Sequence, residues 1–263
     1  MRGESGDRAG RPYTSCRRVE IWLLDFRFPD RRRASHLPDR QTGFAPGVSR
    51  ARLAARRVGS NGLELDHLAV SANTLEEAAQ AVESALGVAM RPGGRHDVFA
   101  THNRLLGLAD GLYLEAIAID PDAPAPKRPR WFDLDRFSGP ARLTNWICRV
   151  DDLSAALSGL EEGAGAPVAL RRGDLRWSMA VPKDGRLPFD NLFTALIQWQ
   201  GTLHPAAMLP PSGCALRRLV VAHPRAGALR KALAGLADAR VVFETGAPAL
   251  MAEFDTPHGA RVL

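Results

Sequence analysis

The chain has 263 residues, of which 45% are hydrophobic, so it can bury a proper core. Residues 1–61 hold 14 of the 35 basic and 6 of the 29 acidic residues, so the net charge of residues 62–263 is −2. The overall net charge of +6 therefore does not indicate a nucleic-acid-binding protein. The three cysteines show no CxxC spacing, which excludes a disulfide-framed protein. The sequence has no signal peptide and no apolar run of ~18 residues, which excludes a secreted or membrane protein. We therefore expect a cytoplasmic protein with no membrane partner.

Residues 1–61 are rich in Arg and show no lasting helical or strand period. Such a segment buries too little apolar surface to offset its ordering entropy, so it is expected to be a disordered extension. It is open to two interpretations: a basic arm for nucleic acid or an acidic partner, or translated upstream sequence of a GC-rich gene. The second is favoured, with the true start near Val58 or Leu63.

Residues 62–130 carry a first βαβββ pattern. Residues 65–70 read as a strand, and Thr74 with Glu77 forms a capping box for a helix that stops at Gly87. A short strand near residues 88–90, a Gly-rich link at 91–96 and strands at 101–108 and 112–119 are expected to follow.

The pattern recurs in residues 131–211 and, in part, in residues 212–263, at a period of about 75 residues. The second unit is predicted to hold strands at 143–150, 168–170, 177–181 and 192–200 and a helix at 153–160. The partial third unit is predicted to hold strands at 216–222, 240–244 and 250–254 and a helix at 227–236. Residues 62–263 are therefore expected to form one domain, since each unit offers an apolar sheet face that another can cover.

Several motifs resemble a glyoxalase-like domain of the vicinal-oxygen-chelate (glyoxalase/bleomycin resistance/dioxygenase) superfamily. They lie at residues 65–70, 93–96, 101–103, 113–115, 120–122, 129–132, 197–199, 203–205 and 256–259. The resemblance implies an α+β fold of paired βαβββ modules that form a cupped, mixed and antiparallel half-barrel, plus the partial third module. It also implies metal ligands on the first and last strands of each module.

The resemblance places metal ligands at His67 and Glu115, and Glu115 is also the expected catalytic proton carrier. Strand alternation puts Glu115 inside an apolar stripe, where a carboxyl group needs a partner. His102 would complete a set of two histidines and one carboxylate suited to zinc, iron, manganese or nickel. The alternative is a metal-free pocket in which His67 and Glu115 hydrogen-bond each other.

The second module departs from the family pattern, because a manual alignment puts Trp146 at the place of His67 and Gln198 at the place of Glu115. Trp does not bind metal and Gln is a poor ligand, so a four-ligand site is incomplete. The expected substrate-binding residues are Arg95, His96, Asn103, Trp146, Gln198 and Trp199.

Two functions are therefore expected. The first is a metal-dependent lyase, isomerase or oxygenase acting on a small oxygenated metabolite. The second is a metal-free small-molecule binding or sequestering protein. Neither involves a nucleotide cofactor, because no P-loop or dinucleotide glycine fingerprint occurs, and the chain is expected to be a monomer or homodimer.

Overall fold

The computed structural model describes residues 62–160 and 163–263, which belong to one compact unit, Arg56–Leu263. The expectation of a disordered extension at residues 1–61 lies outside the described residues. Within these two ranges, no helix is long and apolar enough to cross a membrane.

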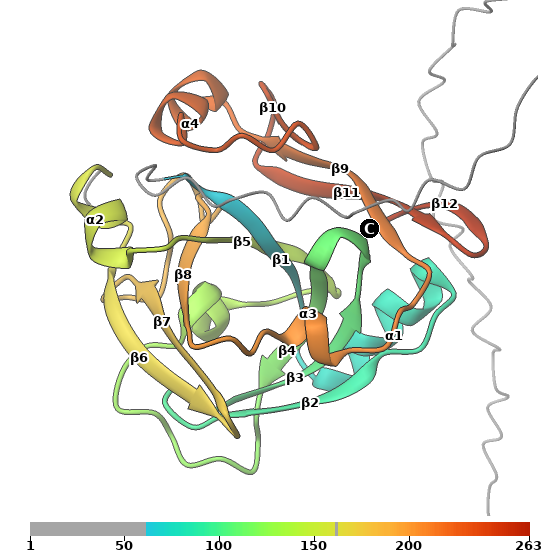
Figure 1. Cartoon of the computed structure of the whole chain (residues 1–263). Coiled ribbons are helices and arrows are strands. Elements are labelled where there is room, and N and C mark those ends of the chain that lie inside the picture. Colours follow the sequence, from blue (N-terminus) through green and yellow to red (C-terminus); the bar gives the residue numbers. More distant parts are fainter. Residues whose placement is uncertain (1–61, 161–162) are drawn as a thin grey trace, which may run out of the picture. The chain divides into compact units, whose positions relative to one another are not determined.

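The first module follows the expected order of strand, helix and three strands (Figure 1). Its elements are β1 (Glu64–Ser71), α1 (Leu75–Leu86), β2 (Arg91–His96), β3 (Thr101–Gly107) and β4 (Tyr113–Ile119). A short 3₁₀ turn, Ala109–Gly111, joins the last two strands.

Helix α1 begins and ends as its sequence predicts. The Thr74 hydroxyl accepts a hydrogen bond from the Glu77 amide, and the Glu77 carboxyl accepts one from the Thr74 amide, which completes the capping box. Gly87 ends the helix at φ 72, a left-handed conformation that glycine adopts without strain.

Strand β2 corrects one prediction. The Gly-rich stretch at residues 91–96 is not a connecting link but the edge strand itself, and residues 88–90 precede it. Its pairing with β3 shifts between Pro92 and Arg95, so Gly93 and Gly94 form an irregular segment within the strand. Arg95 and His96 therefore lie on a strand rather than on a loop.

The second module repeats the order. Its elements are β5 (Arg142–Arg149), α2 (Leu153–Ser158), β6 (Ala166–Arg172), β7 (Leu175–Val181) and β8 (Ala195–Gln200). A 3₁₀ segment, Trp131–Arg136, lies between the two modules, and a single-turn helix, α3 (Pro205–Met208), follows the second.

The two modules share one eight-stranded sheet with the order β2-β3-β4-β1-β5-β8-β7-β6. The first strands, β1 and β5, are antiparallel neighbours at its centre, and each pairs in parallel with the last strand of its own module. This mixed sheet curls into the expected half-barrel, which confirms the predicted fold class (Figure 1).

The remaining residues form a second sheet of four strands, ordered β10-β9-β11-β12. Its elements are β9 (Ala215–Ala222), α4 (Ala226–Ala232), β10 (Val241–Glu244), β11 (Ala249–Thr256) and β12 (Gly259–Val262). Here the first strand pairs in parallel with the strand directly after the helix, not with the last one. The third unit thus differs from the first two in strand order.

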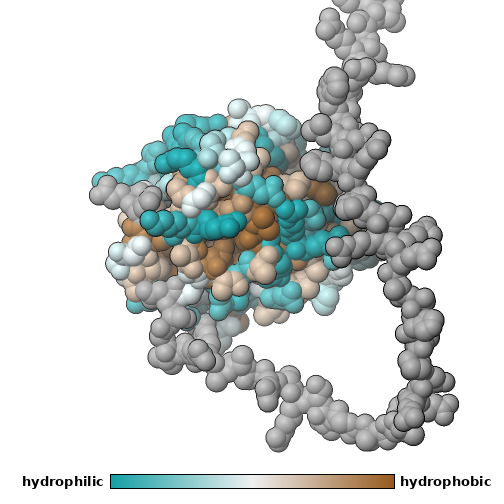
Figure 2. All heavy atoms as spheres, turned by 90° about the horizontal axis from the view of Figure 1, so that it is seen from above, coloured by the Kyte–Doolittle hydropathy of each residue, from teal (hydrophilic) through white to brown (hydrophobic). Residues whose placement is uncertain are grey.

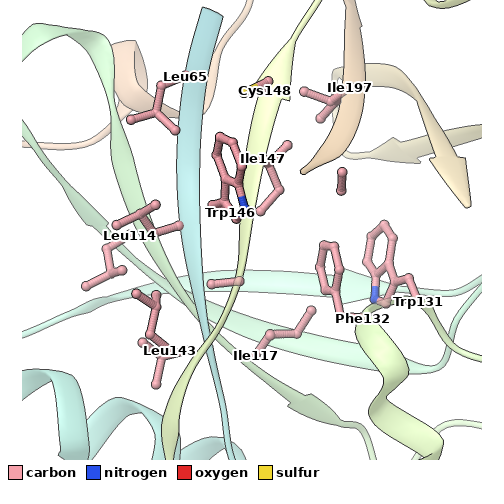
Figure 3. Packing of buried hydrophobic residues seen from close by; sticks show 14 of the residues in the cluster. Leu65, Leu114, Ile117, Trp131, Phe132, Leu143, Trp146, Ile147, Cys148 and Ile197 are labelled. Atoms are coloured by element: carbon pink, nitrogen blue, oxygen red, sulfur yellow. The ribbon is translucent and has the colours of Figure 1, made fainter. Parts of the chain in front are cut away.

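The hydrophobic core joins both sheets. Trp146, which is fully buried on β5, reaches Phe243 of β10 with ring centroids 6.1 Å apart. Figure 3 shows Trp146 beside Ile147 and close to β1, among other buried aliphatic and aromatic side chains. On the outer face viewed in Figure 2, hydrophilic residues interrupt the apolar ones.

Candidate functional site

A cavity inside the curl of the large sheet collects buried polar groups from both modules. It leaves about 20 Å³ for a water-sized molecule, within a partly open hollow of about 320 Å³. A hollow of about 1060 Å³ near residues 163–188 is larger but contains no histidine. The chemistry of the lining therefore points to the smaller cavity, which is lined by His67, His96, Asn103, Tyr113, Glu115, Trp131, Phe132, Arg172, Trp177, Met179, Ile197 and Trp199.

A β-bulge places the central histidine. Leu65 pairs with Cys148 and His67 pairs with Ile147, so Asp66 is an extra residue in β1. Because Cys148 and Ile147 face opposite sides of β5, Leu65 and His67 also face opposite sides of the sheet. Strict alternation along the strand would put Leu65 and His67 on one face, and the bulge breaks that alternation.

Asp66 is the hub of a buried hydrogen-bond network. His67 Nδ1 donates to its Oδ1 at 2.6 Å, while Trp199 Nε1 and His204 Nε2 donate to its Oδ2 at 3.1 and 3.0 Å. Burial alone would raise the pKa of Asp66, but the hydrogen bonds from His204 and His67 outweigh it and hold this pKa well below its usual value. Asp66 is thus an ionised acceptor, which keeps a proton on His67 Nδ1 and turns Nε2 toward the cavity.

His67 Nε2 faces the Glu115 carboxyl group inside the cavity. The distance from Nε2 to Glu115 Oε2 is 3.7 Å, which is too long for a hydrogen bond. The other carboxyl oxygen, Oε1, accepts a hydrogen bond from Asn103 Nδ2 at 2.5 Å. Both side chains are almost fully buried and each is held at its far atom, so their facing atoms have fixed positions.

The Asn103 amide is itself fixed from β2 and from the second module. Its Oδ1 accepts from the Gly94 amide at 2.8 Å and from Arg172 Nη1 at 3.1 Å. A Cβ on Gly93 would overlap this same oxygen, and one on Gly94 would lie 2.6 Å from Arg172 Cδ. The two glycines are therefore required where the β2 backbone passes these side chains.

His96 is a neutral part of the same network. Its Nδ1 lies 3.0 Å from Thr101 Oγ1, and its Nε2 accepts from Arg172 Nη1 at 3.3 Å. Burial, reinforced by the charge of Arg172, lowers the pKa of His96 to about 3. His96 therefore stays uncharged at neutral pH and adds no charge to the cavity.

Aromatic rings enclose the polar centre. Tyr113 stacks on His67 with ring centroids 4.3 Å apart, and burial raises its pKa well above the ordinary value. Trp177 and Trp199 lie 5.5 Å apart on the β7–β8 side, and Trp131 meets His96 edge-on. Figure 3 shows Trp131 and Phe132 projecting from the segment between the modules.

Five predicted site residues meet in this cavity: His67, Glu115, His96, Asn103 and Trp199. His102 does not join them, because it alternates with Asn103 along β3 and lines a different hollow together with Arg95. Arg95 itself is exposed and pairs with Asp120 at 3.1 Å. The structure therefore does not bring the predicted trio of His67, His102 and Glu115 together.

The residues of the second module that occupy the places of His67 and Glu115 also differ from those given by the manual alignment. Both first strands carry one extra residue, Asp66 in β1 and Thr144 in β5, and superposing these bulges matches His67 with Asn145. Strand pairing then matches Glu115 with Ala195. The alignment was one residue off at Trp146, because a bulge is invisible in sequence.

Trp146 and Gln198 consequently point away from the cavity. Trp146 pairs with Leu68 on the outer face, where its Nε1 donates to the Leu192 carbonyl at 2.9 Å. Gln198 binds the Asp151 carbonyl and the Leu153 amide, at the start of α2. Neither is positioned to touch a compound in the cavity.

Sequence reasoning missed Asp66, Arg172 and Trp131. Asp66 left a signal, because an acid beside a histidine in an apolar strand needs a partner. Trp131 also left a signal, since it falls within the family motif at residues 129–132, whereas Arg172, at the end of an exposed edge strand, left none.

The donor set falls short of a resident divalent metal. His67 is oriented by Asp66 through Nδ1, as metal-binding histidines commonly are by a carboxylate. Yet His67 and Glu115 are two ligands where catalytic sites supply three, and among residues 62–160 and 163–263 no group of three His, Cys, Asp or Glu side chains is placed to hold an ion. Asn145 and Ala195 do not complete the set, because Asn145 is not among the residues that line the cavity and Ala195 has no donor.

Comparison with known proteins bears on the family. A family model described as a glyoxalase-like domain matches residues 65–237. No curated protein matches the chain.

Solved structures with a related chain path include a hypothetical protein from Staphylococcus aureus, 12% identical with a TM-score of 0.45, the match covering 64% of this chain and 72% of that one. The methylmalonyl-CoA epimerase of Mycobacterium tuberculosis is 19% identical with a TM-score of 0.37, covering 55% and 91%. A variant of the Streptomyces coelicolor enzyme of the same name is 18% identical, also at 0.37, covering 55% and 100%. The family model spans most of the described residues, and the chain belongs to the glyoxalase-like domain family.

Proposed function

We propose that this cavity binds a small oxygenated compound and moves a proton on it, which is isomerase or lyase chemistry. One observation carries the proposal: His67 Nε2 and Glu115 Oε2 face each other at 3.7 Å in a buried cavity, each side chain anchored behind by Asp66 or Asn103. Two anchored groups that can each take up and return a proton are what proton abstraction and return require.

In the proposed reaction the Glu115 carboxyl group removes a proton from a carbon next to a carbonyl group. His67 Nε2, which approaches the compound from the same side as Glu115, takes the proton of the adjacent hydroxyl group and gives it to the former carbonyl oxygen, while the C–H electron pair passes through the C=C bond of an enediol. Return of the proton to a neighbouring atom completes an isomerisation, with no net gain or loss of protons. The enclosing aromatic rings exclude water, which strengthens both interactions.

The test follows proton exchange with solvent and requires no knowledge of the product. The protein is incubated in D₂O with a panel of 2-hydroxyketones, 2-hydroxy acids and 2-oxo acids, and ¹H NMR records the loss of C–H signals. We expect exchange in at least one compound, and at least a hundredfold slower exchange in Glu115→Gln and His67→Ala. Glu76→Gln, an exposed carboxyl group on α1, is the matched control. Undiminished exchange in both site variants would contradict the proposal.

Metal content is a separate measurement. We expect elemental analysis of the purified protein to find zinc, iron, manganese and nickel each well below one equivalent, because the donor set has two ligands. If the protein holds a full equivalent of one metal, and this metal is lost in both His67→Ala and Glu115→Ala, the metal-dependent reaction would be supported instead.

A second candidate function is a metal-free binding protein. It is favoured by the second module's share of the lining, which consists of Trp177, Met179, Ile197, Trp199 and Arg172 and holds no carboxyl group or histidine. Binding of a compound in the panel without any exchange of its C–H protons would support this function.

A further inference from the structure

Arg172 is a cation in the cavity, and it forms no ion pair with a carboxylate among residues 62–160 and 163–263. It is the last residue of β6 and is half-buried. Its two hydrogen bonds in the described part of the chain use only Nη1 and go to neutral acceptors, Asn103 Oδ1 and His96 Nε2. A guanidinium group has five N–H donors, so most of them remain for another acceptor.

Residues of the first module fix the position of the Arg172 side chain. Gly94 leaves the space that its Cδ occupies, because a Cβ there would lie 2.6 Å away. The Nη1 atom is held between two side chains of the first module, although Arg172 comes from the second. This anchoring fixes the remaining N–H groups at the cavity, across the Asn103 amide from Glu115.

We propose that Arg172 binds the carboxylate of the cavity's ligand, so that the site takes small carboxylic acids. The planar guanidinium fork matches a carboxylate bidentately, and this half-buried cation, whose hydrogen bonds within the described residues go to neutral acceptors, gains from an anionic partner. This inference rests on the proposed use of the cavity and names the class of compound: a hydroxy or oxo acid, with the carboxylate at Arg172 and the reacting carbon toward Glu115.

The first experiment compares matched ligands on the unaltered protein by isothermal titration calorimetry. Lactate and pyruvate are the carboxylate probes, lactamide is the neutral analogue, and inorganic phosphate is the alternative anion. We expect the carboxylates to bind at least tenfold more tightly than lactamide and phosphate. Equal binding of lactate and lactamide, binding of phosphate alone, or no binding of either carboxylate would overturn the proposal.

The second experiment changes the cation. Arg172→Met is expected to weaken carboxylate binding at least tenfold, and Arg172→Lys, which keeps the charge but loses the fork, to weaken it less. Arg171→Met is the matched control, because Arg171 is the exposed neighbour on the same strand. Urea unfolding of each variant separates loss of binding from loss of fold. Unchanged lactate affinity in a folded Arg172→Met protein would overturn the assignment.

The two proposals fail separately. Glu115→Gln is expected to abolish proton exchange but to keep carboxylate binding. If the unaltered protein binds carboxylates through Arg172 and never exchanges their protons, the catalytic proposal fails and the carboxylate site stands.

Discussion

At Asp66 one buried carboxylate holds together side chains from three parts of the chain: β1, β8 and the loop before α3. The hydrogen bond to His67 sets which of its nitrogens faces the cavity. Asp66 is therefore a positioning residue rather than a catalytic one, and its loss should affect both stability and the state of His67.

Asp66→Asn is expected to lower the free energy of unfolding by about 3 kcal/mol at pH 7, since it disrupts a buried charge network. Because folding lowers the pKa of Asp66 below 3.8, its stabilisation is present above that pH and is lost as the pH falls from 3.8 toward the lowered value. Urea unfolding at pH 7 and pH 3 measures both effects. The exposed Asp122→Asn serves as control, and equal stability of the two variants would refute the role given to Asp66.

His96 makes the free energy of unfolding depend on pH in a second, higher range. Folding lowers its pKa from 6.5 to about 3, so below pH 6.5 the unfolded chain takes up a proton that the folded chain does not. Stability from this group is complete above pH 6.5 and falls with the pH, by about 2 kcal/mol between pH 7 and pH 5. Urea unfolding at these two pH values should show a smaller difference for His96→Gln; an identical difference would mean that His96 does not cause it.

Among the elements, strand β2 depends most on its glycines. Gly93→Ala places a Cβ against Asn103 Oδ1 and 2.8 Å from the Asn103 carbonyl oxygen. We expect it to destabilise the fold by about 2 kcal/mol and to disturb the Asn103–Glu115 hydrogen bond. Thermal unfolding and ligand titration measure the two effects. Gly227→Ala, in α4 with open space around it, is the control and should be neutral or slightly stabilising.

The elements also mark where sequence reasoning succeeds. Helix α1 was predictable because its capping box and glycine stop are local signals. Strand β2 was not, because Pro and Gly normally argue against a strand, and it forms only through pairing with β3. The site follows the same division: His67 and Glu115 were identified, whereas the bulges that decide which neighbours they meet depend on register between distant strands.

For the whole molecule, the two sheets are expected to unfold together. The Leu63 amide bonds the Gly235 carbonyl at 3.1 Å, and the Ala109 amide bonds the Cys214 carbonyl at 2.9 Å, so the backbones are joined at separate points. Phe243 adds an aromatic contact to Trp146. Shared core and shared hydrogen bonds favour one cooperative transition.

Far-UV circular dichroism and tryptophan fluorescence should therefore give the same urea midpoint. Phe243→Ala is expected to lower that midpoint for both signals, with a loss of about 2 kcal/mol, because the side chain is half-buried. Separate midpoints for the two signals would show that the four-stranded sheet unfolds independently. The presence of repeated units was predictable from sequence, but the different strand order of the third was not, since order depends on packing rather than on local pattern.

The two halves of the cavity differ in how freely they can change. The first module supplies the coupled groups, His67, His96, Asn103 and Glu115, and almost any substitution there disturbs several hydrogen bonds at once. The second supplies mainly shape, through Trp177, Met179 and Ile197. Random mutagenesis confined to these three positions should therefore yield variants with altered ligand preference and intact chemistry, which makes the β7–β8 wall the natural starting point for redesigning selectivity.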